Sequence, residues 1–176
     1  MKLLLHVCCA PCSIKCIEVL AAEGIKPYLF WYNPNIHPYT EYRSRLDSLK
    51  LFAEKTELPL VVEDEYGLRS FVKNENGDRH HFCYRLRLKK TARFAAENGF
   101  DAFSTTLLIS PYQNHELIRQ TGEELAATFK SEFLYRDFRP RFREGQSQAR
   151  TAGYYMQKYC GCIFSEEERY LSRSGA

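Results

Sequence analysis

Short apolar runs alternate with segments of helical periodicity along this chain of 176 residues. Strands are expected at residues 2–7, 28–32, 60–62, 102–106 and 133–138. The intervening segments carry apolar residues three and four positions apart, which is the spacing of an amphipathic helix. Strands that alternate with helices predict an α/β fold, in which helices flank a parallel sheet and the crossovers are right-handed.

The length of the chain suits one domain, because domains commonly hold about 100–200 residues. We see no internal repeat or linker and therefore expect residues 1–176 to form a single domain. No run approaches the ~20 apolar residues that a membrane helix needs, and the first six residues are too short and too soon polar for a signal peptide. We expect a cytoplasmic protein without a membrane partner.

Three thiols lie close together directly after the first expected strand, at Cys8, Cys9 and Cys12. Adjacent cysteines do not readily form a disulfide with each other, but they can direct two sulfurs at one metal. In the cytosol such thiols are more often metal ligands or redox groups than structural disulfides. Thiolates select iron–sulfur clusters or zinc, whereas buried cysteines can also simply pack in a core. We interpret Cys16 as a packing residue.

Three further thiols lie later in the sequence. Cys83 follows His80 and opens a helix expected over residues 83–98, after a polar stretch at 63–81 that reads as a surface loop. A helix N-terminus stabilises a thiolate, which makes this a good ligand position. Cys160 and Cys162 flank one glycine, a spacing that permits a strained, easily reduced disulfide or a chelate. We predict that the six thiols converge at the carboxyl edge of the sheet.

Basic and aromatic residues alternate around the last expected strand. Arg136, Arg139 and Arg143 are interleaved with aromatic side chains. Cations suit phosphates and aromatic rings suit unpaired bases, so this stretch predicts an RNA contact; a solvated surface is the alternative. Asp137 lies among them and can serve as metal ligand, proton donor or ion-pair partner. Two helices are expected to follow, over residues 146–159 and 165–171.

Five blocks of the sequence, in this order, resemble the QueH family of epoxyqueuosine reductases. They are HVCCAPC at 6–12, YNPNIHP at 32–38, CYRLRL at 83–88, FSTTLLISPY at 103–112 and YCGCIFS at 159–165. The resemblance implies a cytoplasmic, cobalamin-independent oxidoreductase. It would remove the epoxide oxygen of epoxyqueuosine at the tRNA wobble position, the last step of queuosine tRNA modification. It also implies a fold like that of the nucleotide α-hydrolases, the HUP-like class, although the Ser-Gly-Gly-x-Asp-Ser loop is absent and no ATP is expected.

The resemblance further implies a [4Fe–4S] cluster, with an additional iron in some members. Carried over to this chain, the ligands are Cys8, Cys9 and Cys83, with Cys12 nearby as a metal ligand. His80 stands where the family usually has cysteine, so the fourth ligand is His80, Cys12 or an open position. Cys160 and Cys162 match the redox-active pair.

The proton donor of the implied reaction is Asp137, His37 or Tyr112, and Arg136, Arg139 and Arg143 would meet the tRNA. The electron donor is not identified by the sequence. Two other functions remain open from the residues alone. One is a zinc-stabilised RNA-binding module without catalysis, because the same thiols can hold Zn²⁺. The other is a thiol–disulfide oxidoreductase built on Cys9 and Cys12.

Overall fold

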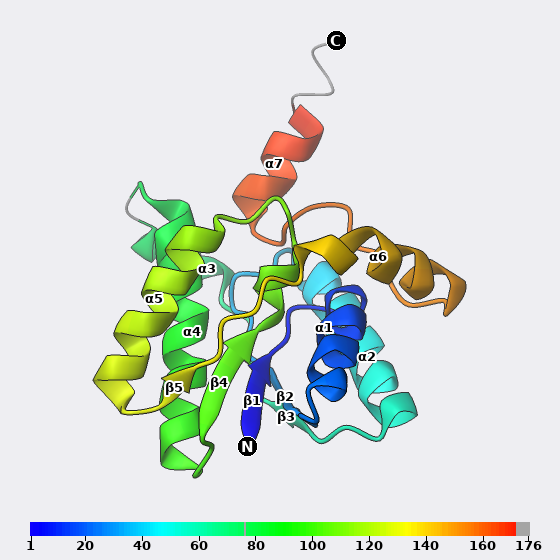
Figure 1. The fold of residues 1–176 in the computed structure, drawn as a ribbon. Coiled ribbons are helices and arrows are strands. Elements are labelled where there is room, and N and C mark those ends of the chain that lie inside the picture. The colour runs from blue at the N-terminus through cyan, green and yellow to red at the C-terminus, as the bar shows by residue number, and fades with distance from the viewer. Residues whose placement is uncertain (76, 172–176) are drawn as a thin grey trace.

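The structure, a computed structural model, describes residues 1–75 and 77–171. Its centre is a parallel five-stranded sheet in the order β3-β2-β1-β4-β5, seen in Figure 1. The strands are β1 (Leu3–His6), β2 (Tyr28–Trp31), β3 (Leu60–Val62), β4 (Ala102–Thr105) and β5 (Glu132–Phe133). The predicted α/β fold with a parallel sheet is therefore confirmed.

Helices cover both faces of this sheet. The α-helices of the described chain are α1 (Ala10–Ala22), α2 (Tyr39–Thr56), α3 (Leu68–Asn74), α4 (Arg79–Glu97), α5 (His115–Phe129), α6 (Phe142–Thr151) and α7 (Ile163–Leu171). In Figure 1, α1 and α2 lie on one side of the strands, α4 and α5 lie on the other, and α7 stands above their carboxyl ends. No helix among the described residues is long and apolar enough to cross a membrane.

The order of the strands creates a switch point beside the central strand β1. Leu3, Leu4 and Leu5 of β1 are fully buried, as expected for a strand covered on both faces. From β1 the chain winds outward to β2 and β3, and then returns to pair β4 with the other edge of β1. In such sheets, ligands bind at the carboxyl ends of the strands where the winding reverses. Here those ends carry Val7-Cys8 after β1 and Thr106 after β4.

Local signals account for several helix ends. Pro11 lies in the first turn of α1 as predicted, where its missing N–H leaves no bond unmade. The side chain of Asn114 accepts a hydrogen bond from the Leu117 N–H and caps α5. Gly24 follows α1 with φ of +76°, a conformation that glycine adopts without steric cost.

Two predictions about the middle of the chain are wrong. Cys83 does not open its helix, because α4 begins at Arg79 and the Asp78 side chain caps it by accepting from the His81 N–H. Cys83 therefore lies in the second turn, beyond the free N–H groups of the helix terminus. The stretch at 63–81, predicted as loop, contains the short helix α3. Phe71 is the buried residue of α3. It packs against Cys83 and Cys162 and so holds an otherwise polar segment against the rest of the protein.

Two predictions near the end of the chain are also corrected. The fifth strand was expected over 133–138, but β5 ends at Phe133. Its neighbour β4 ends at Thr105 and is followed by a 3-10 helix (Thr106–Ile109). The Leu134 N–H still donates to the Phe103 carbonyl, but the chain then leaves β4, and the Phe138 N–H donates to the Leu108 carbonyl of that 3-10 helix. The helix expected over 146–159 ends at Thr151, two residues before Gly153, whose φ is +73°. Residues 154–162 then run without regular structure.

Candidate active site

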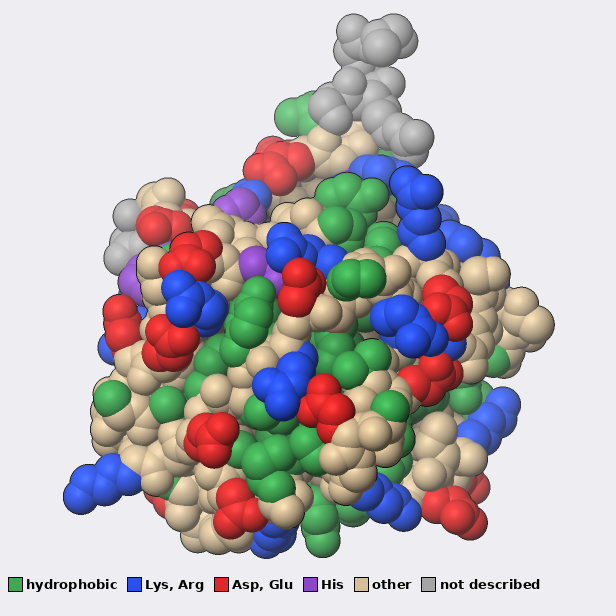
Figure 2. Space-filling model, viewed as in Figure 1, with side chains coloured by type: hydrophobic (Ala, Val, Ile, Leu, Met, Phe, Trp, Pro, Cys, Tyr) green, Lys and Arg blue, Asp and Glu red, His purple; other side chains and the backbone are tan. Residues whose placement is uncertain are grey.

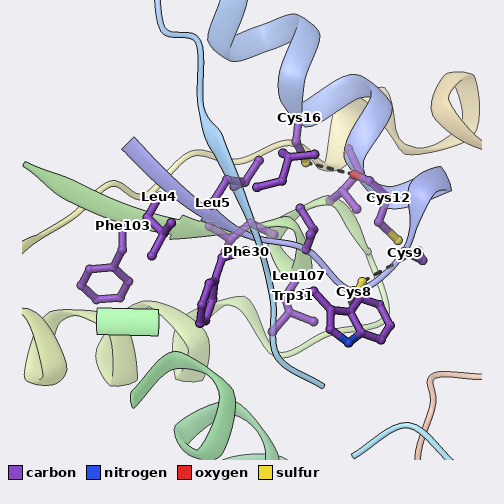
Figure 3. Packing of buried hydrophobic residues seen from close by; sticks show 14 of the residues in the cluster. Leu4, Leu5, Cys8, Cys9, Cys12, Cys16, Phe30, Trp31, Phe103 and Leu107 are labelled. Atoms are coloured by element: carbon purple, nitrogen blue, oxygen red, sulfur yellow. Dashed lines mark hydrogen bonds between the residues drawn. The ribbon is translucent and has the colours of Figure 1, made fainter. Parts of the chain in front are cut away.

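Cys8, Cys9 and Cys12, which we call the thiol triad, occupy the turn from β1 into α1. Their sulfur atoms all lie within 4.8 Å of one another, and all three side chains are buried. The Cys8 and Cys9 sulfurs are 3.8 Å apart, as Figure 3 shows. Cys9 is the N-cap residue of α1 and Cys12 lies in its first turn, so the helix dipole favours negative charge at these sulfurs. Of the six thiols predicted to converge, these three form the compact group, whereas Cys83, Cys160 and Cys162 lie outside it.

Neighbouring strands hold this turn in place. The Asn33 side chain, which follows β2, donates to the Val7 carbonyl at 2.9 Å. The Cys8 N–H donates to the Thr106 hydroxyl, after β4, at 3.3 Å. His6 lies beneath the turn with Nδ1 2.9 Å from the Thr105 hydroxyl and Nε2 3.2 Å from the Asn33 side-chain oxygen. Residues from three strand ends therefore fix the position of the triad.

The three thiols are electrostatically unequal. Hydrogen bonds from Cys12 and Cys9 hold the pKa of the Cys8 thiol well below its usual value. Burial raises the pKa of Cys9, and the hydrogen bond with Cys8 raises the pKa of Cys12. The first negative charge of the triad therefore belongs to Cys8, with two neighbouring S–H groups to stabilise it.

A pocket of about 630 Å³ opens beside the triad. Cys8 and Cys12 line it together with Cys160, although Cys160 is nearly 150 residues further along the chain. Two glutamine amides point at these sulfurs. Gln157 Nε2 lies 3.9 Å from the Cys12 sulfur, and Gln113 Nε2 donates to the Cys160 sulfur at 3.3 Å. The pocket therefore brings the triad and an exposed thiol to one cavity.

Cys83 and Cys162 lie in an apolar cluster with Phe71, and both are buried. Cys160, in contrast, is exposed, and all seven cysteines are free thiols. Burial raises the pKa of Cys83 to about 11, with the negative charge of Cys160 and Cys162 acting in the same direction. The thiols of this second group are close enough to interact electrostatically. They differ in access, because only Cys160 faces the pocket.

Arg87, which the sequence groups with the other cations of its helix as an RNA contact or a solvated face, interacts with both groups of thiols. Its side chain is buried, and its guanidinium donates to the sulfur of Cys83 at 3.0 Å and to the Cys83 carbonyl at 3.2 Å. It also interacts electrostatically with Cys160 and Cys8 and lines the pocket. Within the described part of the chain it forms no ion pair with a carboxylate. Of the thiols near this permanently charged group, Cys8 is the one whose lowered pKa favours the compensating negative charge.

Residues 159–163 are held on α2 and on the loop after β2. Arg45 of α2, fully buried and paired with Glu41 at 2.7 Å, donates to the carbonyls of Tyr159 and Cys160. His37 Nδ1 accepts from the Ile163 N–H, and the His37 N–H donates to the Gly161 carbonyl. Burial lowers the pKa of His37. This ring is therefore a positioning group for the segment that carries Cys160.

Two residues predicted for the site lie outside the pocket. Asp137 is exposed and pairs with Arg139 at 2.7 Å, and the hydrogen bond from Arg139 lowers its pKa. It is therefore a charged, ion-paired carboxylate that does not line the pocket, and nothing in its surroundings favours the protonated form that a proton donor needs. His80 is also exposed, stacks on Tyr84 at 6.3 Å and lines a separate hollow with Glu75. The structure does not bring His80 into the thiol triad.

The arginines predicted to bind RNA do not line the pocket. Arg136 pairs with Glu23 at 3.0 Å and Arg139 pairs with Asp137, whereas Arg143 is exposed and forms no ion pair with a described residue. The other two candidate proton donors also differ in place. His37 is buried in the loop after β2, and Tyr112 is 85% exposed at the pocket rim. Cys16 of α1 is buried in the core, as expected for a packing residue.

The donor atoms at the triad fit a thiolate-bound metal group. Three soft ligands lie within 4.8 Å of one another, they are shielded from water, and a buried guanidinium lies near enough to offset the negative charge that thiolates bring. Thiolate ligands of this kind select iron–sulfur clusters or zinc over hard cations. The geometry supports a metal site at Cys8, Cys9 and Cys12.

Comparison with known proteins places this geometry in context. The family model "Epoxyqueuosine reductase QueH" matches residues 3–168. Proteins named epoxyqueuosine reductase QueH from Dehalococcoides mccartyi and Acinetobacter baylyi are 36% and 37% identical to this chain. The first match covers 96% of this chain and 94% of the relative, and the second covers 93% and 80%. A relative of the same name from Thermotoga maritima is 34% identical over 94% of this chain and 91% of its own.

One solved structure resembles the fold. It is described as a predicted subunit of a tRNA methyltransferase from Methanocaldococcus jannaschii. The two chains align with a TM-score of 0.52 and 10% sequence identity, over 99% of this chain and 89% of the other. At this identity the likeness concerns the fold alone, and it agrees with the α/β class expected from the sequence.

Proposed function

The chain belongs to the QueH family of epoxyqueuosine reductases, and from that premise we propose how its own residues reduce the epoxide. The substrate is epoxyqueuosine at the wobble position of tRNA, and the product is queuosine. The reaction needs no cobalamin and takes place in the cytoplasm. The observation that carries the proposal is the shared pocket, which Cys160 lines together with Cys8 and Cys12.

The reaction consumes two electrons and two protons. The two C–O bonds of the epoxide break, a C=C bond forms between the same two carbons, and the oxygen leaves as water. A dithiol that becomes a disulfide releases the same two electrons and two protons. Cys160 and Cys162 are the proposed pair. An external low-potential reductant then restores the dithiol.

The two members of the pair have different environments. Cys160 is exposed to the pocket and receives a hydrogen bond from Gln113, whereas Cys162 is buried beside Phe71 and Cys83. We assign Cys160 as the thiol nearest the substrate and Cys162 as its partner. Arg87 keeps a fixed positive charge on the pocket wall, where it stabilises negative charge on a sulfur or on the departing oxygen.

The proposed cofactor is a [4Fe–4S] cluster held by Cys8, Cys9 and Cys83, with Cys12 adjacent. His80 is a proposed fourth ligand, but its ring is exposed in this structure. To bind the cluster, the first turn of α4 would have to move so that the ring points toward the thiols. When bound, such a cluster supplies one-electron transfer at the pocket wall. Metal analysis after anaerobic purification distinguishes iron and inorganic sulfide from zinc, and a His80→Ala variant with unchanged iron content would remove His80 from the ligand set.

Substitution of Cys160 tests the proposal. The Cys160→Ser variant is assayed anaerobically on tRNA bearing epoxyqueuosine, with dithionite as reductant and mass analysis of the nucleosides. We expect turnover to vanish while iron content and visible absorbance stay at wild-type levels, because Cys160 is not a ligand. Cys16→Ala, which alters a cysteine of α1 that is buried in the core and does not line the pocket, is the matched control and should retain turnover. Wild-type turnover in Cys160→Ser would refute the dithiol step.

A further inference from the structure

The rim of the pocket carries an aromatic ring and two cations that the reaction itself does not use. We propose that this rim is a binding site for single-stranded RNA, in which Tyr112 stacks on an unpaired base and Lys158 and Arg169 contact phosphates. The inference rests on the proposed function. It names the residues that hold the anticodon loop while the wobble nucleotide is turned into the pocket.

Tyr112 is the first component of this rim. Its side chain is 85% exposed, more than any other large hydrophobic side chain among the described residues. It belongs to the loop between the 3-10 helix at Thr106–Ile109 and α5, and it lines the pocket. Phe142 contacts the ring edge-to-face with centroids 5.9 Å apart. The ring is therefore braced on one side and open to a stacking partner on the rest of its surface.

Lys158 and Arg169 are the second component. Both are exposed and both line the same pocket as Tyr112. Neither forms an ion pair with any residue that the structure describes. Glu168, the acidic residue on this lining, is paired with Arg79 at 2.8 Å. The charge on this rim is therefore available to a polyanion, unlike that of Arg136 and Arg139, whose guanidinium groups are paired with carboxylates.

Aromatic and cationic side chains lie together on this part of the surface. Figure 2 shows blue Lys and Arg side chains next to green hydrophobic side chains just below the base of α7. An RNA loop offers the matching chemistry, because its unpaired bases stack on aromatic rings and its phosphates meet cations. The pocket of about 630 Å³ lies within this rim, so a base on Tyr112 would neighbour the nucleotide that enters.

The stacking role is tested by binding and not by turnover. An unmodified, fluorescein-labelled anticodon stem-loop RNA is titrated with the protein, and fluorescence anisotropy reports the dissociation constant. We expect Tyr112→Ala to bind about 5- to 150-fold more weakly, which corresponds to the loss of one stacked base. Tyr112→Phe should bind like the wild type, because the ring remains. Tyr28→Ala, an exposed tyrosine at the opposite end of the sheet, is the control.

The phosphate contacts are tested by salt dependence. The logarithm of the binding constant falls linearly with the logarithm of the salt concentration, and each lost phosphate contact on a single strand reduces the slope by about 0.7. Lys158→Ala and Arg169→Ala should each show this reduction. Lys26→Ala, which removes an exposed and unpaired cation near Tyr28, should leave the slope unchanged.

Binding that is unchanged in Tyr112→Ala, or slopes that are unchanged in Lys158→Ala and Arg169→Ala, would overturn the inference. Melting temperatures equal to that of the wild type ensure that a weakened variant is still folded. Because the RNA carries no epoxide, the outcome is separate from that of the reductase assay. If the wild type reduces epoxyqueuosine but the rim variants bind RNA normally, only the RNA-binding role of the rim is refuted. If the wild type binds the RNA but does not reduce epoxyqueuosine, only the proposed reductase function is refuted.

Discussion

Arg87 illustrates how one side chain can determine the electrostatics of a site. It is one of five cations between residues 85 and 93, and the sequence does not distinguish one of them from another. The structure buries Arg87 against Cys83 and leaves its helix neighbours Arg85 and Lys89 exposed. A buried guanidinium keeps its charge, so anions must gather around it.

Replacement of Arg87 by methionine should separate this role from simple packing. Arg87→Met keeps much of the side-chain volume but removes the charged hydrogen bond to Cys83, a contact worth about 1.5–3 kcal/mol. We expect kcat/KM on epoxyqueuosine tRNA to fall about 10- to 100-fold. Arg93→Met, on the exposed surface of the same helix, should keep full activity. A wild-type rate in Arg87→Met would show that the guanidinium does not serve the reaction.

His6 gives the protein a predicted dependence on pH. Burial, assisted by the charge of Arg87, lowers its pKa from 6.5 to about 4. As the pH falls from 6.5 towards 4, the unfolded chain takes up a proton that the folded chain refuses, so stability is lost over this range. The loss from this residue alone should reach about 2–3 kcal/mol at pH 4.5.

Urea unfolding of the metal-free protein at pH 7 and pH 4.5 measures this loss. His6→Gln can keep a polar contact to Thr105 or Asn33 but does not titrate. The free energy of unfolding should therefore fall less between the two pH values in His6→Gln than in the wild type. Equal losses in the two proteins would mean that other groups account for the acid sensitivity.

At the scale of elements, α2 acts as the support for the segment that carries Cys160. Arg45 and Glu41 are both buried and form an ion pair through Arg45 Nε. The two terminal nitrogens of Arg45 donate to the carbonyls of Tyr159 and Cys160. The hydroxyl of Tyr155 donates to Glu41. Residues 154–162 have no regular structure of their own, so these side-chain contacts replace the backbone hydrogen bonds that a helix would supply.

Loss of this support has a predicted cost. Arg45→Met leaves Glu41 buried without its partner, which should lower the free energy of unfolding by about 3–5 kcal/mol. Turnover should fall with it, because Cys160 is no longer held at the pocket. The matched control is Arg43→Met on the same helix, whose partners Asp47 and Asp64 are exposed; its effect should stay within about 0.5 kcal/mol. Chemical denaturation of both variants compares the two, and similar losses would contradict the anchoring role.

The start of α4 shows which element boundaries the sequence conceals. The cap residue Asp78 is visible in the sequence, but it lies within a polar run that reads as loop throughout. The first three residues of α4 are Arg79, His80 and His81, and without an apolar residue among them the predicted start of the helix was set too late. The strand expected over 102–106 ends one residue early, at Thr105, whose side chain accepts from the Leu107 N–H and caps the 3-10 helix at Thr106–Ile109.

At the scale of the molecule, the described sheet and its helices share one continuous core. A single cluster of buried side chains joins β1, β2 and β4 with α1, α2, α4 and α5. We therefore expect residues 1–176 to unfold as one domain. Far-ultraviolet and near-ultraviolet circular dichroism should follow the same single transition in urea. Two separated transitions would reveal a second folding unit.

The alternation of strands and helices, and with it the parallel sheet, can be predicted from the residues alone, because the hydrophobic period of each segment is a local property. The same holds for the thiol triad, since residues 8, 9 and 12 are neighbours on one turn. Which distant groups join them depends on how the elements pack. The tertiary structure brought Cys160 and Arg87 to the pocket and kept Asp137 and His80 outside it, because the direction of a side chain from a loop or helix depends on what packs around that element and not on its place in the sequence.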